Sequence, residues 1–434
     1  MKITCCRLCQ SPRLRKVVDL GWHPLADTFL PADLQYGPET TYPLQLGQCD
    51  DCGHVATLYS VSAVDRYQKH EYSYDSSNSR VSIAHFKTFC DAVRRELAPA
   101  PDALVVDVGS NVGTLLAHFR DEGHARVMGV EPAANIAAIA EADGIPTIND
   151  FFGPAAAARI LETAPVQVLL SANVVNHADD LPAVLRTADQ VLAPDGSFVF
   201  EVPYLLELVQ RTAFDTIYHE HVHYYGVKPL AACLARHGFG ITRIDSLEYM
   251  CGSIRVYARR GVGMAPVVDA MVRAEELFGL YRPETWAAFM RRVLSTKLAV
   301  NEHLARIRAD GGRIIGIGAA TKGNTLLNYC RLDTDLIAYI TDASPLKIGK
   351  CMPGSHIPIV SDDQIDGGVT HALILPWNIA DFLKAKLAHL GLRFYVPQVD
   401  PHPATLPTRP TPSPTWNSSI SIPRTATTAA SSPT

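Results

Sequence analysis

The chain has 434 residues, 47% of them hydrophobic and 19% charged, with a formal net charge of −5 at pH 7. This length exceeds one hydrophobic core, so we expect two or three domains of an ordinary globular protein. The slightly acidic balance argues against a nucleic-acid partner. No apolar run approaches the ~20 residues that cross a bilayer, and the N-terminus lacks the apolar core of a signal peptide. We therefore expect a cytoplasmic protein without a membrane partner, in which thiols stay reduced.

The first predicted module spans residues 1–70 and contains two Cys-x-x-Cys pairs, Cys6-Arg-Leu-Cys9 and Cys49-Asp-Asp-Cys52. Two residues between thiolates let both sulfurs reach one tetrahedral Zn²⁺ at about 2.3 Å, and two pairs complete its shell. The 39 residues between the pairs exceed the usual zinc-ribbon spacing, so chance pairs or a redox dithiol are the alternatives. Four thiolates leave no open position for chemistry, so we expect the zinc to be structural.

The second predicted domain spans residues 71–265, where short apolar runs alternate with Ala- and Leu-rich stretches. This alternation predicts a βαβ series around a parallel sheet. The expected buried strands lie at 103–108, 125–130, 166–171 and 197–202.

The last predicted domain spans residues 266–400 and opens with a helical stretch that reaches about residue 310. A second strand–glycine-turn–helix unit starts at residue 313. The strands expected in this domain lie at 313–318, 336–340, 372–375 and 394–396. Residues 401–434 are mostly Pro, Ser, Thr and Ala and predict a disordered tail. The fold class is therefore α/β, with two Rossmann-like domains after a zinc-binding module.

A candidate cofactor site lies in the run Asp107-Val-Gly109-Ser-Asn111-Val-Gly113, which joins a strand to a helix. The glycines allow close approach of a ligand, and the helix N-terminus offers free N–H groups. Glu131 ends the next strand about 20 positions later, where an acidic residue suits a ribose diol. The Gly-x-x-x-Gly pattern disfavours a dinucleotide and favours S-adenosylmethionine, although two glycines in such a turn also arise from structural need.

Two further segments extend this predicted site. The run Asp150-Phe151-Phe152 follows the next expected strand, at a position where enzymes that use S-adenosylmethionine contact its adenine. Asn173 and His177 follow the strand that ends at residue 171, at the edge where open α/β sheets bind ligands.

The densest polar cluster of the sequence is at residues 218–225, with three histidines, three tyrosines and one carboxylate. Tyr218, Glu220 and His221 together offer a phenol donor, an orienting carboxylate and a proton acceptor, which favours acid/base chemistry. The alternating His219, His221 and His223 leave a metal site as one alternative, and a hydrogen-bonded structural network as another.

These motifs together resemble the S-adenosylmethionine-dependent sugar C-methyltransferases of deoxysugar biosynthesis, which make branched sugars such as tetronitrose, mycarose and noviose. The resemblance covers residues 5–398. Its marks are the two cysteine pairs, Asp19-Leu-Gly-x-x-Pro24-Leu-Ala-Asp27, the first glycine turn, Ala172-Asn173 with His177, Phe214-Asp-x-Ile-Tyr218-x-Glu220-His221, Gly252-Ser253-Ile-Arg255, Gly316-x-Gly318-Ala-x-x-Lys322 and Trp377-Asn378.

The resemblance implies a zinc-binding module, a class I methyltransferase domain and a C-terminal Rossmann-like domain that helps to enclose a nucleotide sugar. It implies His221 as the base that forms an enolate from a 4-keto sugar, with Tyr218 beside it. Glu220, His177 and a tyrosine of the run Tyr72-Ser-Tyr74 would line the same pocket. S-adenosylmethionine would bind at Asp107, Gly109, Asn111, Gly113, Glu131 and Asn173.

Two departures from the family pattern bear on the substrate. Asn111-Val112-Gly113 stands where the family often has Asn-Asp-Gly, and Cys251-Gly252 stands for a Gly-Gly pair. The second glycine turn, with Asp342 24 residues after Gly318, also resembles a dinucleotide fingerprint. The alternatives are therefore an O- or N-methyltransferase of a glycan precursor, an NAD-linked oxidoreductase, and a scaffold protein with dead sites.

Overall fold

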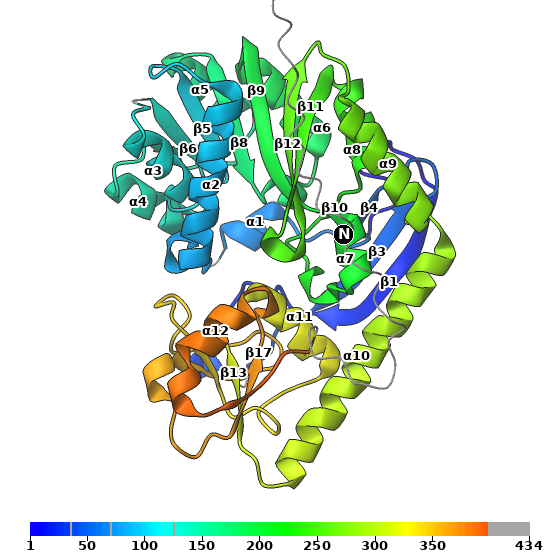
Figure 1. Ribbon diagram of the computed structural model, residues 1–434, viewed down its shortest axis with the longest axis vertical. Coiled ribbons are helices and arrows are strands. Elements are labelled where there is room, and N and C mark those ends of the chain that lie inside the picture. Colours follow the sequence, from blue (N-terminus) through cyan, green and yellow to red (C-terminus); the bar gives the residue numbers. More distant parts are fainter. Residues whose placement is uncertain (35–36, 70–71, 125, 398–434) are drawn as a thin grey trace, which may run out of the picture. The chain divides into compact units, whose positions relative to one another are not determined.

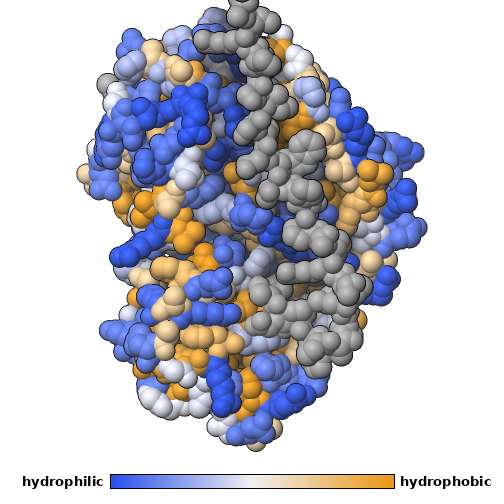
Figure 2. Space-filling view, in the orientation of Figure 1, coloured by the Kyte–Doolittle hydropathy of each residue, from blue (hydrophilic) through white to orange (hydrophobic). Residues whose placement is uncertain are grey.

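The structure is a computed structural model that describes residues 1–34, 37–69, 72–124 and 126–397 (Figure 1). The tail expected from residue 401 lies outside these ranges. None of the helices described is both long and apolar enough to span a bilayer. On the face shown in Figure 2, hydrophilic residues surround smaller apolar patches.

The N-terminal region is built on an antiparallel sheet with the order β1-β3-β4-β10. Its first strands are β1 (Leu14–His23), β3 (Tyr42–Cys49) and β4 (Val55–Thr57). Val18 and Leu46 are buried in its core. The fourth strand, β10 (His223–Tyr224), comes from the polar cluster and pairs with β4. The polar cluster is thus anchored on the sheet that carries the second cysteine pair.

The central sheet has seven strands in the order β11-β12-β9-β8-β5-β6-β7. The middle strands β5, β6, β7, β8 and β9 are parallel, and β12 is antiparallel to both β9 and β11. The strands expected at 103–108, 125–130, 166–171 and 197–202 are confirmed. Their bounds are β5 (Leu104–Val108), β6 (Val127–Val130), β7 (Thr147–Ile148), β8 (Val166–Ala172), β9 (Leu192–Pro203), β11 (Phe239–Leu247) and β12 (Ser253–Arg260).

Helices cover both faces of this sheet (Figure 1). Alternate residues of each strand point to opposite faces, so each face has its own apolar core against which helices pack. Val105 joins the core formed with Phe89 and Leu116, whereas Val106 joins the core formed with Ile160 and Leu185. The helices α2 (Arg80–Leu97) and α3 (Thr114–Asp121) therefore pack on one face, and α5 (Pro154–Thr163) and α6 (Leu181–Val191) on the other. The other helices of this part are α1 (Ala63–Tyr67), α4 (Ala134–Ala142), α7 (Leu205–Arg211) and α8 (Val227–Arg236).

The helical stretch expected up to residue 310 is divided into α9 (Pro266–Phe278) and α10 (Pro283–Ala309). Gly279, in the left-handed conformation at φ 79°, ends α9, and Pro283 opens α10 at a position where a missing N–H costs nothing.

The C-terminal domain has a parallel five-stranded sheet in the order β16-β14-β13-β17-β18. The strand expected at 336–340 is misplaced, because β14 spans Ile340–Asp342. The N–H groups of Leu336 and Ile337 bind the carbonyl of Asp333 in a turn, and Ile337 is buried there as part of the core. The other elements are β13 (Ile314–Ile317), α11 (Thr321–Cys330), β16 (Ile359–Ser361), β17 (His371–Ile374), α12 (Ala380–Lys386) and β18 (Arg393–Tyr395), and β2 (Leu30–Pro31) pairs with β15 (Lys350–Cys351).

Candidate active site

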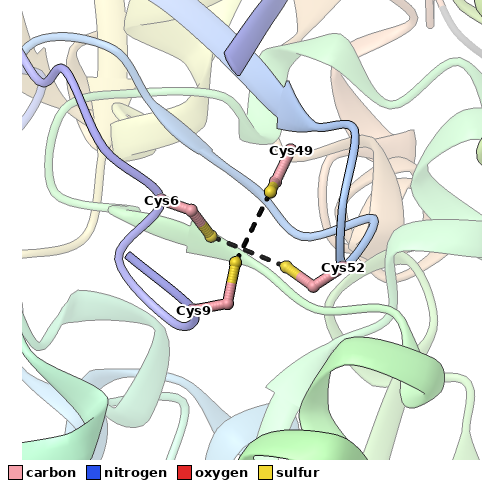
Figure 3. A group of neighbouring side chains, drawn as sticks. All are labelled: Cys6, Cys9, Cys49 and Cys52. Atoms are coloured by element: carbon pink, nitrogen blue, oxygen red, sulfur yellow. Dashed lines mark hydrogen bonds between the residues drawn. The ribbon is translucent and has the colours of Figure 1, made fainter. Parts of the chain in front are cut away.

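The four predicted zinc ligands converge on one point between two turns (Figure 3). The Sγ atoms of Cys6 and Cys52 are 3.6 Å apart, as are those of Cys9 and Cys49. A tetrahedron of sulfurs at about 2.3 Å from a zinc ion has edges of about 3.8 Å, so the four thiols fit the metal. The hydrogen bond between Cys6 and Cys52 lowers the pKa of Cys6 to about 5 and raises that of Cys52, so these two thiols hold one proton between them, which a metal ion would replace.

The three histidines of the polar cluster do not form a second metal site. His223 Nδ1 is 2.8 Å from Nε2 of His54, and the ring of His219 lies against Tyr42. Across the described parts of the chain, the four cysteines are the only group of three or more His, Cys, Asp or Glu residues placed to hold an ion. The metal alternative for this cluster is therefore wrong.

The first glycine turn requires both of its glycines. Gly109 and Gly113 have φ angles of 67° and 80°, in the left-handed region that other residues rarely adopt. A Cβ atom on Gly109 would lie 2.5 Å from Cγ2 of Val174, and one on Gly113 would lie 2.9 Å from Cγ1 of Ile145. The turn therefore leaves no room for side chains at these two positions.

Two buried carboxyl groups flank this turn, from Asp107 at the end of β5 and Glu131 after β6. Glu131 accepts the backbone N–H groups of Asn111 (3.0 Å) and Ala133 (2.9 Å), whereas Oδ1 of Asp107 has no hydrogen-bond partner among the described residues. Burial, and secondarily the charge of Glu131, raises the pKa of Asp107 to about 8. Burial also raises the pKa of Glu131 to about 7. Such a site would be stabilised by a cationic ligand.

The asparagines of the predicted cofactor site have different surroundings. Asn111 uses its amide to hold the neighbouring segment, since its Oδ1 accepts the N–H of Ser76 and its Nδ2 donates to the carbonyl of Tyr74, both at 2.9 Å. Asn173 donates its backbone N–H to the carbonyl of Glu201, and its Oδ1 has no partner among the described residues. Segment 74–76 and the glycine turn are therefore one hydrogen-bonded unit.

Tyr218 and His221 form a hydrogen-bonded pair, in which His221 is buried and Tyr218 is half-buried. The Tyr218 hydroxyl is 2.6 Å from Nε2 of His221, and Nδ1 of His221 is 2.8 Å from the carbonyl of Thr216. A carbonyl only accepts, so Nδ1 carries the proton and Nε2 accepts from the phenol. Burial lowers the pKa of His221 to about 3, which keeps the imidazole neutral.

A second tyrosine–histidine pair lies beside the first. Nδ1 of His177 is 2.8 Å from the hydroxyl of Tyr67, and the rings of His177 and His221 have centroids 4.9 Å apart. Tyr67 was not among the predicted site residues. Its sequence context, the end of a five-residue helix, gives no sign of a partner 110 positions away.

The remaining predicted pocket residues divide into two groups. Glu220 is buried, and burial followed by the charge of Asp27 raises its pKa to about 7. Tyr72 packs against the ring of Tyr67, with centroids 5.5 Å apart, so it belongs with the histidine pairs. Tyr74 instead lies beside Ser82 of α2 and Tyr249, whose hydroxyls are hydrogen-bonded to each other at 3.2 Å.

The second glycine turn leads into a helix whose second residue is a lysine. Lys322, in the first turn of α11, binds the side chain of Asn378 and lies over the ring of Trp377, 5.0 Å from its centroid. The carboxylate of Asp342 accepts the backbone N–H groups of Ala319 (2.7 Å) and Ser344 (2.8 Å). The third position of a Gly-x-Gly-x-x-Gly fingerprint is Thr321 here, which departs from the dinucleotide pattern.

Comparison with protein families gives three matches along the chain. A zinc binding domain matches residues 6–67, a methyltransferase domain matches residues 83–244, and a C-methyltransferase C-terminal domain matches residues 248–397.

Individual proteins match over different lengths. The C-methyltransferase NovU of Streptomyces niveus is 33% identical over 404 residues, covering 91% of this chain and 96% of NovU. Among solved structures, magnesium protoporphyrin IX methyltransferase from Synechocystis PCC 6803 with bound S-adenosylmethionine is 15% identical over 42% of this chain and 82% of its own, with a TM-score of 0.32. The PH0226 protein of Pyrococcus horikoshii OT3 is 15% identical over 43% of this chain and 95% of its own, with a TM-score of 0.36.

Proposed function

This chain belongs to the same C-methyltransferase family as NovU and is an S-adenosylmethionine-dependent methyltransferase, and we propose that its acceptor is a carbon of a 4-keto, nucleotide-activated deoxysugar. The observation that carries the proposal is the hydrogen-bonded pair of Tyr218 and His221, in which Nε2 of a buried, neutral imidazole accepts from the phenol hydroxyl. Such a group can take a proton from carbon.

The proposed chemistry begins at the carbon next to the ketone. Its proton is acidic because the resulting carbanion delocalises onto the carbonyl oxygen as an enolate. Nε2 of His221 takes this proton once the bound substrate displaces the Tyr218 hydroxyl from that nitrogen, and the Thr216 carbonyl, which accepts from Nδ1, stabilises the imidazolium that forms. Before the substrate binds, Tyr218 orients the imidazole; its displaced hydroxyl then donates to the oxygen on which negative charge develops.

The proposed cofactor site supplies the methyl group on a sulfonium, which is an electrophile for the enolate carbon. Asp107 and Glu131 match the charge and hydroxyl groups of that cofactor, and Gly109 and Gly113 allow its close approach. The protein then contributes mainly by placing the two reactants in line. The four cysteines fill the coordination shell of a zinc ion, so the proposed zinc is structural.

The proposed role of the C-terminal domain is to help enclose the nucleotide part of the substrate. Lys322 is mostly buried at the start of α11, where a cation and the helix N-terminus both favour an anion. We assign it to the diphosphate.

The experiment that tests this function uses S-adenosylmethionine with a ¹³C-labelled methyl group and a 4-keto-6-deoxy nucleotide sugar. The expected product shows the labelled methyl coupled to a ring carbon in its NMR spectrum. A labelled methyl on oxygen or nitrogen would instead support the O- or N-methyltransferase alternative.

A further inference from the structure

Asp27 joins three segments of the chain that are far apart in sequence. Its backbone N–H donates to Oε1 of Glu220 at 3.2 Å. Its carboxylate oxygen Oδ1 accepts from the hydroxyls of Ser73 (2.9 Å) and Thr321 (3.0 Å). Asp27 is buried, with 6% of its surface exposed, and it has no role in the mechanism described above.

The second carboxylate oxygens of both acids lack partners. Among the described residues, neither Oδ2 of Asp27 nor Oε2 of Glu220 has a hydrogen bond. The nearby guanidinium of Arg66 donates instead to the carbonyls of Val61 and His177 and to the carboxylate of Asp179. Two neighbouring buried carboxyls without a direct cationic partner do not both ionise readily.

The groups that face this pair are phenols, cations and neutral histidines. They are Arg66 and Tyr67 of α1, Tyr72 and Tyr74, Tyr218 and Tyr224, the histidines His177 and His221, and Lys347 and Lys350 of the C-terminal domain. Burial raises the pKa values of these tyrosines and lowers those of the histidines, so all of them are neutral near pH 7. Burial raises the pKa of Asp27 and brings that of Glu220 to about 7, which leaves this pair as the groups that titrate.

We propose that Asp27 is a positioning residue that shares a single proton with Glu220. Burial, and secondarily the charge on Asp27, keeps Glu220 protonated up to about pH 7, and the Glu220 carboxyl then donates a hydrogen bond to the carbonyl oxygen of the substrate as it gains negative charge. This role deepens the proposed function and rests on it, because it assigns a second donor, beside Tyr218, to the substrate oxygen. The shared proton itself is a property of the protein without substrate.

The first test is an infrared titration of the free protein from pH 5 to 9, following the carbonyl stretch of protonated carboxyl groups. Asp27→Asn keeps the shape, the backbone N–H and an acceptor for Ser73 and Thr321, and Glu220→Gln is its counterpart. If one proton is shared, each single variant loses the same one-proton signal at neutral pH, and the double variant loses no more. Additive losses in the double variant, or no loss in either single variant, would overturn the proposal.

A matched control is Asp215→Asn. Asp215 is equally buried, and its pKa is raised to about 6, but its carboxylate binds Nε1 of Trp377 at 2.8 Å and no atom of the pair. This variant should remove its own signal and leave the titration of the pair unchanged. The infrared experiment needs no substrate, so its result does not depend on whether the proposed methyl transfer is correct.

The second test is the pH dependence of kcat with the proposed substrate. Without the neighbouring charge, Glu220 loses its proton at lower pH, so Asp27→Asn should move the alkaline limb to lower pH by about one unit. Cofactor affinity and the circular dichroism spectrum should match those of the wild type. An unchanged alkaline limb in a folded variant would contradict the positioning role.

Discussion

The two glycine turns of the chain have similar sequences and opposite charges. In the first, Asp107 is the penultimate residue of β5 and Gly113 precedes α3. In the second, the corresponding residues are Gly316 and Ala320, and Lys322 lies in the first turn of α11. Both turns are followed by a strand that ends near an acid, and in both that acid accepts two backbone N–H groups.

This comparison teaches that glycine spacing identifies a ligand-binding turn without identifying the ligand. The partly unpaired carboxyl of Asp107 favours a cation, such as the sulfonium cofactor. Lys322 favours an anion, such as the diphosphate of a nucleotide. One fold unit used twice can therefore bind the two different reactants of a single reaction.

Removal of the metal tests whether the first turn works independently of the cysteine cluster. Chelation should disrupt the N-terminal sheet and, through the pairing of β4 with β10, the segment of Tyr218 and His221. We expect methyl transfer to fall by about 100-fold or more, while calorimetry shows cofactor affinity within a few-fold of the wild type. A chelated, metal-free protein that stays fully active would show that the cluster holds no structural metal.

The corresponding acids of the two turns provide a matched pair of variants. Glu131→Ala should weaken binding of S-adenosylmethionine by about 100-fold, because it removes charged hydrogen bonds to a ribose. Asp342→Ala should leave that affinity unchanged and lower only thermal stability, since Ala319 and Ser344 lose their acceptor. Calorimetry and thermal melts measure both effects. Equal losses of affinity in the two variants would contradict the claim that only the first glycine turn binds S-adenosylmethionine.

Lys322→Met tests whether the second glycine turn binds the diphosphate of the substrate. Loss of one charge-assisted contact to a diphosphate should raise KM for the nucleotide sugar by about 10-fold. The affinity for S-adenosylmethionine should stay the same. If KM for the sugar does not change, the second turn does not bind the diphosphate.

The smallest effect that we expect is a proton released on cofactor binding. In the free protein the pKa of Asp107 is about 8, so this group is mostly protonated at pH 7 and ionises when a cation binds. Affinity should therefore rise between pH 6 and pH 8. Calorimetry in buffers of different ionisation enthalpy should detect a release of up to about one proton, and Asp107→Asn should remove it. No difference between the buffers would contradict the role of Asp107.

Local patterns in the sequence predicted the central sheet well and the N-terminal region poorly. The strands around Val106 and Leu169 were predictable because each is a short apolar run between turn residues. The apolar run at 336–340 gave the same signal but forms a turn that buries Ile337. Pairing of β10 with β4 joins segments about 170 residues apart, and no local pattern carries that information.

The same reason separates the predicted from the missed residues of the pocket. Tyr218, Glu220 and His221 are neighbours in sequence, so their density was visible. Tyr67 and Asp27 reach the pocket through hydrogen bonds to His177 and Glu220 that span 110 and 193 positions. Such contacts depend on the complete fold, and only the structure places these residues beside the others.

The most direct test of the central claim is exchange of the hydrogen next to the ketone with heavy water. The assay uses the 4-keto nucleotide sugar and the demethylated cofactor, so that a proton moves and no methyl does. Wild-type protein should catalyse the exchange, and His221→Ala should slow it by about 10²–10⁴-fold with cofactor affinity unchanged. Exchange at the wild-type rate in His221→Ala would show that His221 is not the base.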